Sequence, residues 1–238
     1  MGCFKIMLMT KAAVTIQENA EEVEAYSQVF TQRVARAFDK LDEDAHRIQE
    51  QAYAKMAEGA GPEADEAWAS EAAYFEGVGY YQVTNAIRQG VFNLMVAGLY
   101  HLLEQQAAKM VKEVLPTPRR PPQDDRYPVP VMSHVMLERG VDLTKFNHWT
   151  KLDDLRLVAN AVKHGDGVSA EKLKGRRPEL FESPLDLPRF ASASSPPIRP
   201  LVGEGMWLTE DDFNDYANTL KGFWHELEPH LPVFDPQR

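Results

Sequence analysis

The sequence predicts an all-α fold, a helical bundle built on a long antiparallel helical hairpin and joined by proline-rich loops. Residues 15–58 contain neither proline nor glycine, and apolar side chains recur there at spacings of three and four from Val23 to Leu41. The same periodicity returns in later stretches, whereas no segment alternates convincingly as a strand would, apart from a short hairpin-like pattern at 201–208. We therefore expect helices to form the regular structure.

The N-terminal half is expected to form the hairpin. Residues 1–14 are an extension, and residues 15–58 form one long amphipathic helix. The sequence from Glu58 to Pro62 supplies a glycine stop and a proline suited to a first helical position, so the chain turns back here. A second helix then runs to about Val114. Two glycines, Gly77 and Gly79, are expected to bend or break it, and its second half is expected to be the most buried element (Ile87, Val91, Leu94, Met95, Gly98 and Leu102).

Shorter elements follow. Residues 115–130 form a proline-rich linker, and a short helix from Val131 to Arg139 ends at Gly140. Asp142 or Thr144 is a candidate cap for a further short turn.

The main bundle is expected to span residues 15–167 and to include a motif helix at 152–164. Residues 168–207, rich in proline and serine, form a loop-rich excursion. Residues 208–230 then form a helix, begun by Thr209 as N-cap, that packs on the same bundle.

The composition is that of a globular chain that does not enter a membrane. Of 238 residues, 44% are hydrophobic and 26% are charged, and no apolar run has the length that a bilayer span requires. The single cysteine, Cys3, excludes an internal disulfide, so we expect a cytoplasmic protein. Gly2 and Cys3 resemble the start of an acylation signal, but Ile6 stands where that signal needs Ser or Thr, so we expect no lipid anchor.

Because the net charge is negative, nucleic-acid binding would need a locally basic surface. The formal net charge of −10 opposes indiscriminate binding to phosphate backbones. Between Arg156 and Arg177, however, basic residues outnumber the acids Asp166 and Glu171. We expect a basic surface there, with these candidate nucleic-acid-binding residues: Lys172, Lys174, Arg176 and Arg177.

The motif helix holds the strongest functional signal, in the segment LDDLRLVANAVKHGDG from Leu152 to Gly167. At about 100° per residue, four polar side chains share one face, the polar stripe: Arg156, Asn160, Lys163 and His164. An apolar arc should pack on the bundle: Leu152, Leu155, Val158, Ala159 and Val162. Gly165 should end the helix in a left-handed conformation.

A simpler interpretation of the polar stripe stays open. Lys163 and His164 in a last turn favour the negative end of the helix dipole, and Asn160 can be an ordinary surface residue. The coincidence of the stripe with the downstream basic run LKGRRPELF favours a phosphate-binding surface instead.

The stretch LRLVANAVKHGDG, preceded by two long helices, resembles the HEPN superfamily (the nucleotide-binding domain of higher eukaryotes and prokaryotes). Its members are helical bundles and frequently metal-independent ribonucleases of toxin–antitoxin, abortive-infection and CRISPR systems. The family motif is an arginine, a polar residue, three further residues and a histidine. In this chain, Asn160 takes the polar position and His164 that of the histidine, whereas Ala159 occupies the position of the arginine. Arg156, one turn earlier, and Lys163 are candidate electrostatic substitutes.

Other chemistries find little support. Glu43 and His46 have the spacing of a metal-binding bundle but lack a second such pair, and His101 with Glu104 is in reverse order, so we expect no metal. The sequence contains no phosphate-binding loop, dinucleotide fingerprint or nucleophile elbow, and we expect no cofactor.

Two hypotheses follow, and whether the protein is an enzyme stays open between them. The resemblance implies an HEPN-like RNA-binding protein or endoribonuclease of a prokaryotic defence or toxin–antitoxin system, homodimeric because two motif helices often face each other in the family. His164 would then act as general acid or base, Asn160 would orient it, and Arg156 or Lys163 would hold the phosphate. The alternative is a non-catalytic helical bundle with a protein partner, such as an antitoxin, immunity factor or scaffold, and a nucleotide sensor lies between the two.

Overall fold

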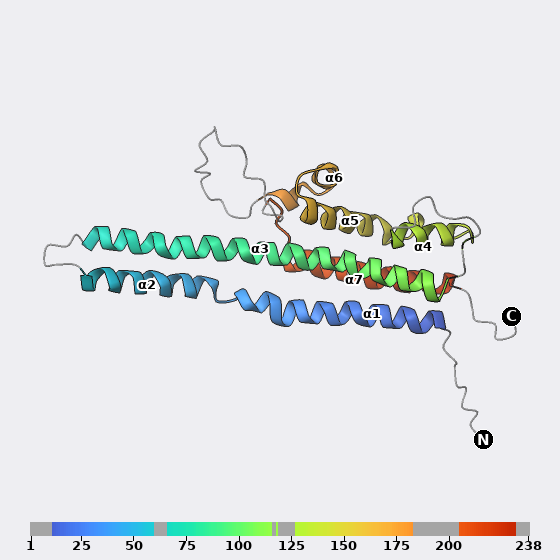
Figure 1. The fold of residues 1–238 in the computed structure, drawn as a ribbon, viewed down its shortest axis with the longest axis horizontal. Coiled ribbons are helices and arrows are strands. Elements are labelled where there is room, and N and C mark those ends of the chain that lie inside the picture. Colours follow the sequence, from blue (N-terminus) through green and yellow to red (C-terminus); the bar gives the residue numbers. More distant parts are fainter. Residues whose placement is uncertain (1–10, 60–65, 116–117, 119–126, 183–204, 232–238) are drawn as a thin grey trace, which may run out of the picture.

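The computed structural model describes residues 11–59, 66–115, 118, 127–182 and 205–231. These residues form an all-α bundle without strands (Figure 1). Its α-helices are α1 (Lys11–Val29), α2 (Leu41–Gly59), α3 (Glu66–Glu113), α4 (Pro128–Leu137), α5 (Trp149–His164), α6 (Val168–Arg176) and α7 (Glu210–Leu227). Short 3₁₀ turns lie at Ala35–Phe38, Leu143–Lys145, Pro178–Phe181 and Glu228–His230.

The expected single helix over residues 15–58 is wrong, because the chain is interrupted between α1 and α2. A π-helical turn at Phe30–Val34 is followed by the 3₁₀ turn and a bend before Leu41. The change in winding leaves the Phe30 side chain fully buried, with its ring 4.0 Å from that of Phe213 and 5.0 Å from that of Phe92. Packing around this aromatic cluster accompanies the break, which no glycine or proline announces in the sequence.

The helix α3 organises the bundle. It runs for 48 residues without interruption, so the expectation that Gly77 and Gly79 bend or break it is also wrong. A Cβ atom on Gly77 would lie 3.0 Å from the carbonyl oxygen of Ala45 and from the Cβ of Gln49. The glycine therefore permits close approach of α2 to α3 rather than a kink.

The core lies along the C-terminal half of α3, where α1, α4, α5 and α7 pack around it (Figure 1). Trp224 and Tyr216 of α7 are fully buried there. The Trp224 indole Nε1 donates a hydrogen bond of 2.7 Å to Gln106 Oε1, and Gln106 Nε2 donates to the carbonyl oxygen of Asn19 at 3.0 Å. This buried polar network joins α1, α3 and α7.

The N-terminal half of α3 pairs with α2 and projects beyond the rest of the bundle, and we call this pair the arm (Figure 1). The side chains of Ile87 and Leu94 are 55% and 54% exposed. The prediction that this stretch is the most buried element is therefore wrong for these two residues. The buried face of α3 is instead formed by Phe92, Val96, Leu99, Leu103 and Met110.

The C-terminal elements follow the sequence more closely. Thr209 and Asp212 form a capping box at the start of α7, which confirms the predicted N-cap. Residues 168–182, expected to be loop-rich, instead contain α6 and a 3₁₀ turn. The predicted hairpin at 201–208 lies partly outside the described residues, and 205–208 contain no strand. Among the described helices, none has the length and hydropathy to cross a bilayer. The acylation-like start lies outside the described residues.

Candidate functional site

The motif helix α5 begins at Trp149, one turn earlier than expected, and ends at His164 as predicted. Its C-cap, Gly165, has a φ of 69°, a conformation that favours glycine. Both flanks of the polar stripe are buried, because Leu157 and Ala161 pack away from solvent in addition to the predicted arc. Of that arc, Ala159 is only partly buried. The polar stripe is thus a narrow exposed edge between two packed faces.

Arg156 turns toward its own helix and not toward His164. Its Nε and Nη2 atoms donate to Asp153 Oδ1 at 2.9 and 2.7 Å. Arg176 of α6 donates to Asp153 Oδ2 at 2.9 Å and to Asp154 Oδ1 at 2.8 Å. Burial of the Asp153 carboxyl opposes its ionisation, but the hydrogen bonds from Arg156 and Arg176 outweigh burial and lower the pKa of Asp153.

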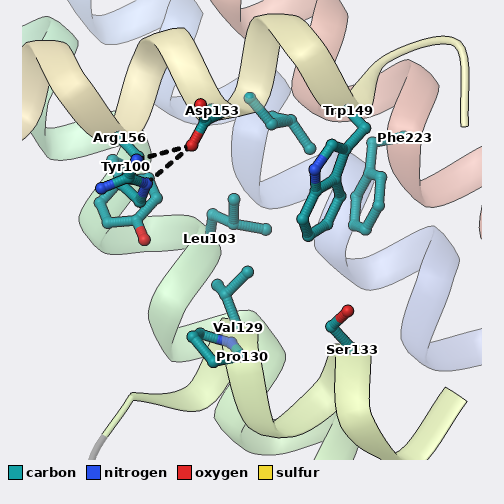
Figure 2. A pocket seen from close by; sticks show the side chains of 10 residues that line it. Tyr100, Leu103, Val129, Pro130, Ser133, Trp149, Asp153, Arg156 and Phe223 are labelled. Atoms are coloured by element: carbon teal, nitrogen blue, oxygen red, sulfur yellow. Dashed lines mark hydrogen bonds and ion pairs between the residues drawn. The ribbon is translucent and has the colours of Figure 1, made fainter. Parts of the chain in front are cut away.

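This ion-pair cluster borders a cavity of about 320 Å³ between α3, α4, α5 and α7. Figure 2 shows Arg156 and Tyr100 at one end and the rings of Trp149 and Phe223 at the other. Ser133 adds a hydroxyl to a lining that is otherwise mostly apolar, completed by Leu103, Val129, Pro130 and Leu152. Burial and the nearby Glu104 carboxylate raise the pKa of Tyr100 to about 12, so its hydroxyl stays protonated at neutral pH as a hydrogen-bond donor.

The remaining members of the polar stripe lie at the other end of α5. Lys163 and His164 are exposed, and Asn160 is partly exposed. In the part of the chain that the structure describes, the side chains of these three residues make no hydrogen bond or ion pair. The rise of 1.5 Å per residue separates Arg156 from His164 by about 12 Å along the helix axis. The structure therefore does not bring the expected arginine substitute to the histidine.

The downstream basic run divides into paired and unpaired cations. Arg177 forms an ion pair with Glu179 and donates to Asp212 Oδ1 at 3.2 Å and to the Tyr216 hydroxyl at 3.5 Å. Lys172 and Lys174 are exposed and, within the described residues, have no such partner.

Lys174 also lines a shallow cavity of about 200 Å³ together with Gly165 and Asp166, directly after His164. The two lysines, unlike the arginines Arg176 and Arg177, are therefore available to an external anion.

Several cavity residues were not expected from the sequence. No sequence motif marks Asp153 or Tyr100 as site residues. They become candidates only because the cavity that they line is formed by four different helices. Trp149 and Phe223 have the spacing of core residues, and this spacing does not distinguish a cavity wall from the core. The described residues contain no cluster of three or more His, Cys, Asp or Glu side chains that could hold a metal ion, and His46 Nε2 lies 3.5 Å from Glu50 Oε1.

Comparison with known proteins adds no family to this description. Neither the protein-family models, nor the curated proteins, nor the solved structures give a significant match to this chain.

Proposed function

We propose that this protein is an HEPN-like RNA-binding protein, of the kind found in defence and toxin–antitoxin systems, and that the C-terminal end of α5 contacts the RNA backbone. The observation that carries the proposal is the contrast between paired and unpaired cations. Within the described residues, Lys163 and Lys174 have no carboxylate partner, whereas Arg156, Arg176 and Arg177 are held by aspartate or glutamate. Unpaired cations bind phosphate without first breaking an internal ion pair.

Binding is better supported than cleavage. An HEPN-type cut needs a cation beside the phosphate and a histidine positioned for proton transfer. Ala159 supplies no charge, and Arg156 lies about two turns from His164 in a hydrogen-bonded pair with Asp153. Lys163, adjacent to the histidine, is the remaining cation that could hold a phosphate during catalysis.

Fluorescence anisotropy with a short single-stranded RNA at low salt tests the proposal. We expect the variants Lys163→Ala and Lys174→Ala each to weaken binding by about tenfold or less and to reduce the dependence on salt, because each removes a phosphate contact. Lys145→Ala is the matched control, since this lysine is 80% exposed but lies at the opposite end of α5. No RNA binding by the wild type, or equal losses in all three variants, would overturn the proposal.

The same proteins decide whether the RNA is cut. Incubation with RNA followed by gel analysis, with and without His164→Ala, separates binding from catalysis. Cleavage that disappears in His164→Ala would extend the proposal to an endoribonuclease. Equal cleavage by both proteins, or none by either, rejects the catalytic version.

The cavity favours a second candidate, a non-catalytic nucleotide-sensing bundle. Its volume of about 320 Å³ lies at the small end of ligand pockets and suits a planar group stacked on Trp149. A bound nucleotide would raise the midpoint of thermal unfolding, because it binds only the folded state. We expect Trp149→Ala to abolish this rise and the control Tyr53→Ala, at a residue of α2 that is 41% exposed, to preserve it. A screen in which no nucleotide raises the midpoint rejects this candidate.

A further inference from the structure

The arm carries an apolar stripe on its surface, which we call the α3 stripe. Phe75, Val83, Ile87 and Leu94 are 60%, 63%, 55% and 54% exposed. Trp68, which is 63% exposed, extends the stripe toward the start of the helix. At about 100° per residue these side chains fall within an arc of about 120°, and the stripe is about 39 Å long. Single exposed apolar residues are ordinary, but five large ones on one face of a helix indicate an interaction surface.

The α3 stripe lies to one side of the contact with α2. With Trp68 at 0°, the buried residues Ala69, Ala73 and Gly77 lie at about 100°, 140° and 180° around the helix, whereas the middle of the stripe lies at about 40°. A Cβ atom on Gly79, which lies within the stripe, would meet no atom of the described structure within 4 Å. Nothing in the described part of this arm therefore fills the space over Gly79.

The spacing of residues along the stripe, from Trp68 to Leu94, is the same in both directions. In an antiparallel pair of identical helices centred on Tyr81, Phe75 of one copy faces Ile87 of the other. Gly79 faces Val83, so that a side chain enters the gap left by a glycine. Trp68 faces Leu94 at both ends. A stripe that matches its own reverse is what a two-fold symmetric contact between copies requires.

Repulsion between the two copies of Glu76 favours the antiparallel register over a parallel one. Glu76 is exposed and lies within the arc of the α3 stripe, between Phe75 and Gly79. In the antiparallel register the two copies of Glu76 are about 15 Å apart along the axis, beyond the screening length of about 8 Å at physiological salt. In a parallel register they would be adjacent, and Gly79 would face Gly79 across an empty gap. The antiparallel arrangement avoids both penalties.

We propose that two copies of this chain associate through their α3 stripes in an antiparallel arrangement. At roughly 100 to 150 Å² of exposed surface for each large side chain, the stripe supplies about 600 Å² per copy, close to the lower limit for a specific dimer. The association is therefore a concentration-dependent equilibrium. It places the contact between copies on the arm and not between two α5 helices, and it does not depend on RNA binding.

Sedimentation velocity of the full chain from about 1 to about 100 µM tests the proposal. The wild type shifts from monomer to dimer over this range, whereas Phe75→Glu and Ile87→Glu each weaken dimerisation at least tenfold. Leu137→Glu on α4 is the matched control, since Leu137 is 58% exposed but lies off the stripe. Circular dichroism verifies that every variant folds. A wild type that stays monomeric, or dimers that survive both substitutions, overturns the proposal.

A double variant tests the register. In the antiparallel dimer, Phe75→Lys combined with Ile87→Glu places opposite charges against each other twice, so dimerisation is restored relative to either single variant. In a parallel dimer the same changes place like charges together, and dimerisation is lost further. A double variant weaker than both single variants therefore overturns the antiparallel arrangement, whatever the result with RNA.

Discussion

The two halves of α3 belong to one continuous helix but are buried in different ways. The C-terminal half is surrounded by helices, and Val96, Leu99 and Leu103 are almost fully buried. The N-terminal half touches α2, and its buried residues are small, namely Ala69, Ala73 and Gly77. Large apolar side chains such as Phe75 lie on the surface of that half. Hydrophobic residues in a helix therefore do not by themselves locate the core; the number of neighbouring helices decides it.

Removal of a large aromatic ring should separate the two halves most clearly. Phe213→Ala deletes a fully buried ring beside Phe30, and we expect it to lower the free energy of unfolding by about 3 to 5 kcal/mol. Phe75→Ala in the arm should change it by about 0.5 kcal/mol or less in dilute solution, because that ring is 60% exposed. Urea denaturation measures both. Similar losses would mean that the arm is covered in the monomer.

Loss of a buried polar group in the core should lower the free energy of unfolding more than loss of an exposed one in the arm. Gln106→Met leaves the buried Trp224 indole N–H and the Asn19 carbonyl without their partner, at a cost of about 2 to 3 kcal/mol. Gln51→Met in the arm alters an exposed side chain and should change the free energy of unfolding by about 0.5 kcal/mol or less. The red-shifted fluorescence expected of a disturbed Trp224 gives an independent readout. If both substitutions were neutral, the buried network would not contribute to stability.

Replacement of Gly98 and of Gly79 by alanine should change stability in opposite directions. A Cβ atom on Gly98 would collide with the Tyr26 hydroxyl, which donates to the Met95 carbonyl oxygen at 3.0 Å, so Gly98→Ala should destabilise the bundle by about 1 to 2 kcal/mol. Gly79→Ala meets open space and should stabilise the monomer by about 0.5 to 1 kcal/mol through helix propensity. Thermal unfolding in dilute solution reports the sign of each change, and a stabilising Gly98→Ala would show that Tyr26 moves aside without penalty.

The smallest effect concerns acid stability at the cavity. Because the folded pKa of Asp153 lies below its ordinary value of 3.8, its contribution is present at neutral pH and is lost as the pH falls below about 4 through the folded pKa. Asp153→Asn should therefore cost about 1 kcal/mol or less at pH 7 and make stability less dependent on pH between about 5 and about 3. Asp44→Asn, in an exposed ion pair of the arm, is the control. An unchanged acid slope in Asp153→Asn would contradict the assigned pairing.

Local signals were sufficient for some elements. The N-cap residue Thr209 predicted where α7 begins, and the helical spacing of Phe213, Tyr216 and Trp224 places these buried residues on one face, because caps and periodicity act within a few residues. The end of α5 at His164 followed from Gly165 for the same reason. These elements carry their boundary information in their own residues.

The break after α1 and the partners of the basic residues had no such signal. Phe30 packs against rings of α3 and α7, and Arg177 finds its partner Asp212 on a helix that follows much later in the chain. The spacing of apolar and charged residues predicts which of them share a face of a helix, but not which distant group each side chain will contact. In the structure, Arg156 therefore pairs with Asp153 at the edge of the cavity and does not lie beside His164.

By itself, the sequence determined the all-α class, the capping of α7, the end of α5 and the polar residues that the end of α5 exposes. The tertiary structure alone decided which face of α3 is covered, which arginines are neutralised and where the cavity forms. The physical reason is range: backbone hydrogen bonds and caps join residues within a turn of each other, whereas burial and ion pairing depend on helices that come together only when the chain has folded.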